Sequence, residues 1–184
     1  MFNKLANNPG FAGSMEAICA TALHRQQWIG FGDGRPVTTN LSVDAGIPAI
    51  YGGVGLNIVN ETIGQYDNLG LQLSYAYRTE LGNGQVGTGI SLGMYQSSLD
   101  GASLKPANSG DPALPTAEAQ GSALDFGFGI YYNNEDAYIG LSSSNITEPT
   151  IEWENATTQK LVRHYYLISG YYYQVSNAIS LNPS

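Results

Sequence analysis

The chain has 184 residues, of which only 12% are Asp, Glu, Lys or Arg, well below the roughly 25% usual in soluble domains. The 15 acidic and 7 basic residues give a formal net charge of -8, which argues against a nucleic-acid partner and against attraction to anionic lipid headgroups. Because no stretch of about 18 apolar residues occurs, the sequence excludes membrane-spanning helices.

The first part of the chain predicts an irregular segment followed by three strands. Met1–Glu16 contains the turn-forming sequences NNPG and AGS, so we expect an extended or coiled lead-in. Strands are expected at about Ala17–Ile29, at Val37–Asp44 after the turn cluster FGDGRP, and at Ile50–Asn60.

The middle of the chain carries the clearest pattern. In LGLQLSYAY, Leu69–Tyr77, leucines and tyrosines alternate with small or polar residues, which indicates a fourth strand with one apolar face. The sequence GNG at Gly82–Gly84 predicts a tight hairpin to a fifth strand, because Gly and Asn tolerate positive φ. An aperiodic segment rich in Pro, Ser, Ala and Gly predicts a long loop at about Ser97–Ser122.

The last part predicts three more strands and the start of another. Leu124–Tyr132 alternates Leu, Phe and Ile with Asp and Gly, and NNED supplies a short turn before a strand at about Ala137–Asn145. A polar loop with Trp153 follows, then an eighth strand at about Val162–Val175. The final sequence AISLNPS is typical of the opening of a ninth strand.

The repetition of these segments predicts the fold class. Strands of about ten residues with apolar side chains on one face and small or polar ones on the other are typical of transmembrane β-barrels, which face lipid and a polar lumen. The 23 glycines suit a tightly curved wall, and the 13 tyrosines suit the lipid–water interface. We therefore expect an all-β, antiparallel transmembrane β-barrel, with residues 1–16 as its lead-in and 17–184 as barrel.

A polar and aromatic group in the first strand invites a functional interpretation, but a structural role explains it better. His24, Arg25 and Trp28 lie close together in sequence. Arg25 and Gln27 point to one face and suit a polar lumen, whereas Trp28 suits the membrane interface. The single cysteine, Cys19, has no motif that supports a redox role.

No motif predicts catalysis, a cofactor or a metal. Ser14, Ser42 and Ser74 lack the spacing of a nucleophile elbow, and His24 and His164 lie far apart in the sequence. The GxG triplets do not open a helix after a strand, as a dinucleotide site requires. Two histidines and one cysteine lack ligand spacing, so we expect no catalytic, cofactor-binding or metal-binding residues.

Four blocks of sequence resemble the PorP/SprF family, outer-membrane proteins of the Bacteroidetes associated with type IX secretion and gliding motility. The second block is the most specific, because Arg25, Gln27, Trp28, Pro36 and Thr38 occur at a spacing that generic barrels have no reason to share. The blocks are MFNKLANNPGFAGS, LHRQQWIGFGDGRPVTTNLSVDAGIP, LGLQLSYAYRTELGNGQVGTGISLGMY and HYYLISGYYYQVSNAISLNPS.

The resemblance implies an outer-membrane location and a non-enzymatic role in type IX secretion or gliding, by binding that assists export or surface anchoring of secreted adhesins. Its implied partners are outer-membrane lipid, a secreted adhesin and periplasmic components of the system. It also implies that a signal peptide has been removed or is missing, and that further strands follow residue 184. The alternative is a small, closed, eight-stranded pore or a lipid-modifying barrel enzyme.

Overall fold

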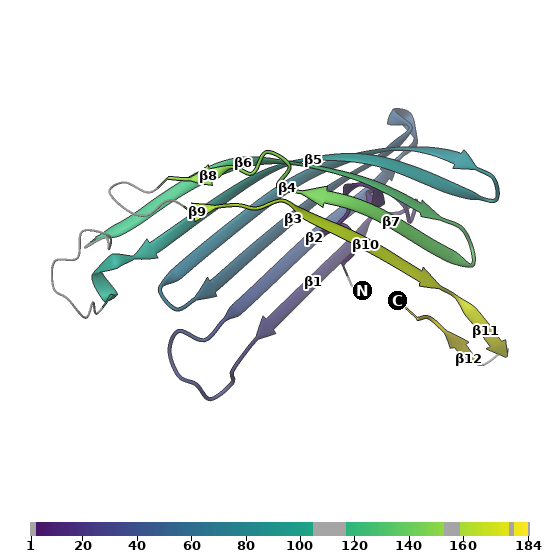
Figure 1. Ribbon diagram of the computed structural model, residues 1–184. Coiled ribbons are helices and arrows are strands. Elements are labelled where there is room, and N and C mark those ends of the chain that lie inside the picture. The colour runs from purple at the N-terminus through teal and green to yellow at the C-terminus, as the bar shows by residue number, and fades with distance from the viewer. Residues whose placement is uncertain (1–2, 105–116, 153–158, 177–178, 184) are drawn as a thin grey trace.

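Eight antiparallel strands form one curved sheet in the computed structural model, which describes residues 3–104, 117–152, 159–176 and 179–183 (Figure 1). Neighbours in the sheet follow chain order from β1 to β7, and β10 then pairs with β7. The strands are β1 Cys19–Gln26, β2 Val37–Ile47, β3 Gly52–Ile63, β4 Tyr66–Leu81, β5 Gly84–Asp100, β6 Glu118–Asn133, β7 Ala137–Ser144 and β10 His164–Tyr171.

Smaller elements lie outside this sheet. The short strands β8 Thr150–Ile151 and β9 Gln159–Lys160 pair with each other, as do β11 Tyr173–Ser176 and β12 Ile179–Leu181. The 3₁₀ turns are η1 Pro9–Phe11, η2 Pro48–Ile50 and η3 Gly101–Ser103. None of the helical elements in the described part of the chain is long and apolar enough to cross a membrane.

The sheet is a half-barrel with two free edges. Within the described residues β1 pairs only with β2, and β10 pairs only with β7. The prediction of an all-β, antiparallel barrel wall is therefore confirmed. The closed eight-stranded barrel of the alternative is not what these strands form, because β1 and β10 do not pair.

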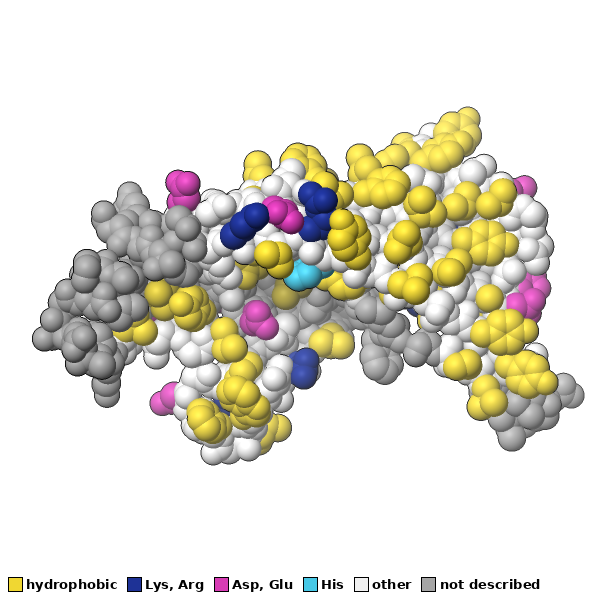
Figure 2. Space-filling view, viewed as in Figure 1, with side chains coloured by type: hydrophobic (Ala, Val, Ile, Leu, Met, Phe, Trp, Pro, Cys, Tyr) yellow, Lys and Arg dark blue, Asp and Glu magenta, His cyan; other side chains and the backbone are white. Residues whose placement is uncertain are grey.

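The two faces of the sheet differ in the way that the alternation predicts. An apolar row crosses five strands, since each of its side chains is the register partner of the next: Val43, Leu56, Leu73, Leu92 and Phe126. All five are exposed although they are large and hydrophobic, and Figure 2 shows such side chains spread over much of the visible surface. We assign this outer face to the lipid.

The connections divide the sheet into two ends. At one, which we call the short-turn end, β2–β3, β4–β5 and β6–β7 are joined through residues 48–51, 82–83 and 134–136. At the other, the long-loop end, the connections 27–36, 101–117 and 145–163 are longer, and only the turn 64–65 is short. The GNG hairpin is confirmed, with Gly82 at φ 62°.

Several predicted boundaries are wrong, each for a local reason. The predicted loop Ser97–Ser122 is too long at both ends, because β5 continues to Asp100 and β6 begins at Glu118. Leu99 and Ala119 pair there and pack on Ile151 in a small hydrophobic core. The polar composition of the surrounding sequence gave no indication of this core. Part of that loop, residues 105–116, and Trp153 lie outside the described residues.

The other differences lie at strand ends. The first strand stops before Trp28, which has φ 52°, and the third begins after Tyr51, which has φ 51°. The predicted eighth strand, Val162–Val175, is divided between β10 and β11. The sequence AISLNPS does contain a strand, β12, but it pairs with β11 and not with the edge of the large sheet.

We expect Phe126→Arg to lower the free energy of unfolding in phospholipid vesicles by about 2–4 kcal/mol, because a charge near the bilayer midplane loses its hydration. Phe126 lies within the outer apolar stretch of β6, which alternates from Leu124 to Ile130. Urea titration followed by far-UV circular dichroism measures the change.

The matched control is Gln120→Arg, which places the same charge on the same face of β6 but beyond the apolar stretch. Its free energy of unfolding should change by less than about 1 kcal/mol. Equal losses in the two variants would contradict the assignment of the outer face to lipid.

Candidate functional site

The N-terminal segment, residues 3–16, lies on the inner face of the sheet (Figure 1). Its 3₁₀ turn η1 contacts β4, β5, β6 and β7. Leu5 and Ala12 are buried there with Ala76 of β4, and Phe11 packs edge-on against Tyr131 of β6 with ring centroids 5.2 Å apart. The irregular conformation agrees with the sequence, whereas the docked position was not predicted.

Glycines on both sides allow the segment to lie directly on the strands. A Cβ on Gly89 of β5 would meet the backbone of Pro9 and Gly10 closer than real Cβ atoms approach, and the same holds for Gly10 against the carbonyl oxygen of Gly87. Gly13, at φ 71°, lies against Gly53 of β3, where a Cβ would be 2.7 Å from the facing Cα. Side chains here would hold the segment away from the sheet.

Hydrogen bonds fix the segment at both ends of this contact. The backbone N–H of Gly13 donates to Oδ2 of the buried Asp44 at 2.9 Å. Nδ2 of Asn8 donates to the carbonyl oxygen of Ile130 at 3.0 Å, and Oδ1 of Asn8 accepts from the N–H of Gly10 at 2.9 Å. Buried polar groups must be paired in this way if the segment is to remain docked.

Lys4 contributes a cation–aromatic contact. Its Nζ lies 3.3 Å from the ring centroid of Tyr138 and donates to the hydroxyl oxygen of Tyr131 at 3.3 Å. Burial lowers the pKa of the Lys4 ammonium from its ordinary value, because the charged form loses hydration. Attraction to the aromatic face opposes that loss, so the segment can place a cation here without a carboxylate partner.

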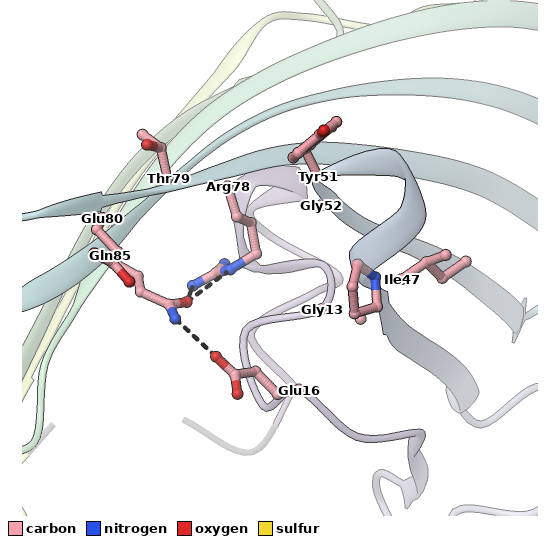
Figure 3. Close-up of a pocket in the computed structure, with 11 residues that line it drawn as sticks. Gly13, Glu16, Ile47, Tyr51, Gly52, Arg78, Thr79, Glu80 and Gln85 are labelled. Carbon is pink, nitrogen blue, oxygen red and sulfur yellow. Dashed lines mark hydrogen bonds between the residues drawn. The ribbon is translucent and has the colours of Figure 1, made fainter.

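Arg78 of β4 lies beneath the segment at the short-turn end (Figure 3). Its Nη1 donates to the carbonyl oxygen of Gly10 at 3.3 Å, and its Nη2 donates to Oδ1 of Asn133 at 2.9 Å. Nε and Nη2 both donate to Oε1 of Gln85, at 3.3 and 3.2 Å. Nε2 of Gln85 then donates to Oε1 of Glu16 at 2.7 Å, so one network joins β4, β5, β6 and the segment.

The same residues line a cleft of about 440 Å³, which we call the short-turn cleft. Its walls include Arg78, Gln85 and Glu16, together with Tyr51 and Glu80 (Figure 3). The Arg78 guanidinium is held by neutral acceptors, and within the described residues no carboxylate forms an ion pair with it. The arrangement therefore fixes the segment on the sheet.

Sequence reasoning missed these residues, although a signal for Arg78 was present. Arg78 continues the small, polar face of the strand that includes Gln72, Ser74 and Ala76, so its position in the alternation assigns it to the lumen. For Asn8 and Gly10 no periodic pattern exists, and only their packing against the sheet reveals their role.

The first-strand group does not form one site. His24 lies on the outer face of β1, where Nδ1 is 2.9 Å from the hydroxyl of Thr39. Arg25 occupies the inner register, opposite Thr38, as its assignment to the lumen requires. Trp28 follows the strand, 62% exposed and 5.7 Å from the ring of Phe31, and its role as an interface anchor stays a prediction.

The remaining candidates are spread over the sheet. His164 lies on the inner face of β10, at the opposite edge from His24. Ser14, Ser42 and Ser74 are buried in three different elements, and Cys19 is a partly buried free thiol on β1. No group of three or more His, Cys, Asp or Glu side chains in the described part of the chain could hold a metal ion.

We expect Gly89→Ala to displace the N-terminal segment, because the new methyl group overlaps the backbone of Pro9 and Gly10. Overpacking of this size weakens docking enough to raise the rate of tryptic cleavage after Lys4 by about 10- to 100-fold. Intact-mass spectrometry of the folded protein in detergent measures that rate.

Gly93→Ala is the matched control on the same inner face of β5, since its Cβ would have no neighbour closer than 3.6 Å. Cleavage after Lys4 should proceed in this variant as in the wild type. Docking through close glycine contacts would be refuted if Gly89→Ala and Gly93→Ala were cleaved equally fast.

Comparison with known proteins agrees with this architecture. The sequence matches the family described as type IX secretion system membrane protein PorP/SprF over residues 1–184. Neither a curated protein nor a solved structure matches the chain. Because the match extends along the whole sequence, the chain belongs to the PorP/SprF family of type IX secretion system membrane proteins.

Proposed function

We propose that this protein assists the export or surface anchoring of secreted adhesins by non-covalent binding, without catalysing a reaction. The observation that carries the proposal is the family match over residues 1–184, because the family is an outer-membrane component of the type IX secretion system. The rigid sheet supports this role by presenting its longer connections together at one end, and such loops commonly carry recognition.

The two free edges of the sheet require pairing partners if the sheet is to lie in a membrane. Unpaired backbone groups cannot face lipid, and within the described residues β1 and β10 each have one neighbour. We propose that strands beyond these eight complete the wall, as the sequence resemblance implies. The proposed organisation is a lead-in at 1–16, of which residues 3–16 lie on the inner face, and a barrel that begins at residue 17.

The test is affinity purification of the tagged protein from native outer membranes in mild detergent, followed by mass spectrometry. We expect a secreted adhesin and periplasmic type IX components to co-purify, at least tenfold above an unrelated tagged outer-membrane barrel of equal abundance, because stable complexes outlast the wash. Deletion of the gene should also remove the adhesin from the cell surface, and re-expression should restore it.

Two results would count against this function. One is a protein that purifies without any secreted or type IX partner. The other is a deletion strain with unchanged surface adhesin, which would show that export and anchoring proceed without this protein.

A further inference from the structure

A second cleft lies on the inner face at the long-loop end, beyond the docked segment. This long-loop cleft has a volume of about 300 Å³, and Ala6 of the segment forms part of its lining. Strands β3, β4, β5, β6, β7 and β10 supply its walls, with Glu61, Asp125, His164, Tyr95 and Tyr166 among the side chains. It therefore opens toward the end of the sheet that carries the longer connections.

Two acidic side chains and one histidine, His164, line this cleft. Glu61 accepts a hydrogen bond from the Thr38 hydroxyl at 3.3 Å, and Asp125 accepts from the N–H of Asn145 at 2.9 Å and the Thr147 hydroxyl at 3.3 Å. Neither carboxylate forms an ion pair within the part of the chain that the structure describes. Each ionised carboxylate offers about four acceptor positions, so both can accept further donors.

A buried amide in the same cleft also lacks a donor. Asn57 of β3 lines the cleft and is only 5% exposed, yet its Oδ1 accepts no hydrogen bond from the described residues. A buried acceptor without a partner costs about 1–3 kcal/mol. An occupant that brings N–H donors into the cleft would relieve that cost, which makes Asn57 an observation independent of the acidic charge.

Aromatic side chains complete the chemistry of the cleft. Tyr95 and Tyr166 line it, and tyrosine faces attract ammonium and guanidinium groups. The chain itself shows that this inner face accepts a cation, since Lys4 lies 3.3 Å from the ring centroid of Tyr138. Carboxylates, an unpaired amide oxygen and tyrosines together match a basic side chain carried by a polypeptide backbone.

We propose that the long-loop cleft binds an extended segment of the secreted protein through a lysine or arginine side chain. This inference rests on the proposed function and names the chemistry of the partner. The basic group pairs with Glu61, whereas Asp125, three strands away in the sheet, and Asn57 accept hydrogen bonds from other donors of the bound segment. Ala6 of the docked N-terminal segment completes the lining, which otherwise comes from the sheet.

The probe is a fluorescein-labelled heptapeptide of glycine and serine with one central lysine, titrated against the purified full chain in detergent and followed by fluorescence anisotropy. We expect saturable binding that weakens about tenfold when the lysine is acetylated, because acetylation removes the charge. Glu61→Gln should weaken binding of the lysine peptide by a similar factor while leaving the circular dichroism spectrum unchanged.

Glu135→Gln is the matched control, because it removes one carboxylate from the turn at the short-turn end, outside the cleft. Its affinity for the lysine peptide should equal that of the wild type. If Glu61→Gln fails to fold, the comparison of lysine and acetyl-lysine peptides on the wild type still decides the question.

Three results would overturn the proposal: equal binding of the two peptides, equal loss in Glu61→Gln and Glu135→Gln, or tighter binding of a neutral oligosaccharide than of the lysine peptide. If type IX partners co-purify but any of these results is obtained, the proposed function stands. Only the binding of a basic segment in the long-loop cleft is then refuted. Loss of co-purification would instead refute the proposed function itself.

Discussion

The structure depends on the close approach of two backbones, that of the N-terminal segment and that of the curved sheet. Gly10 lies against Gly87, Gly89 and Gly129, and Gly13 lies against Gly53. Glycine is disfavoured in ordinary strands because it lacks a side chain to pack, but here that lack is what brings the surfaces together. Once the segment is docked, its amides and carbonyls must find partners, which Asp44, Asn8 and Arg78 provide.

Two kinds of surface follow from that constraint. The inner face combines small and polar side chains with tyrosines such as Tyr131 and Tyr138. The outer face has exposed apolar rows such as Leu73, Leu92 and Phe126. Each strand contributes side chains to both faces, because successive side chains point to opposite sides of the sheet. The docked segment divides the inner face into a short-turn cleft organised by Arg78 and a long-loop cleft with Glu61 and Asp125.

The location of the clefts gives each a separate chemical environment. Arg78 is surrounded by amides, backbone oxygen and the Gln85–Glu16 hydrogen bond, so its charge serves to hold the segment. At the other end Glu61 and Asp125 accept hydrogen bonds from neighbouring groups but form no ion pair with the described residues. A single inner face therefore has an arginine network that holds the segment at one end and a cleft with two carboxylates at the other.

The sequence by itself determined the fold class, the order of the strands and the outward side of the strands with clear alternation, because a period of two follows from strand geometry alone. In the aromatic cluster at His164–Val175 the alternation left the inward side open. The predicted strand boundaries were least accurate where a polar composition obscured the alternation, as at Leu99 and Ala119. They were also inaccurate next to Trp28 and Tyr51, whose positive φ angles lie beside strand ends.

Only the tertiary structure decided where the N-terminal segment lies, that β1 and β10 remain unpaired with each other, and which polar residues meet in each cleft. These features come from contacts between residues distant in sequence, such as Asn8 with Ile130 and Gly10 with Arg78. No local pattern encodes such pairs, since their geometry depends on how strongly the whole sheet curves.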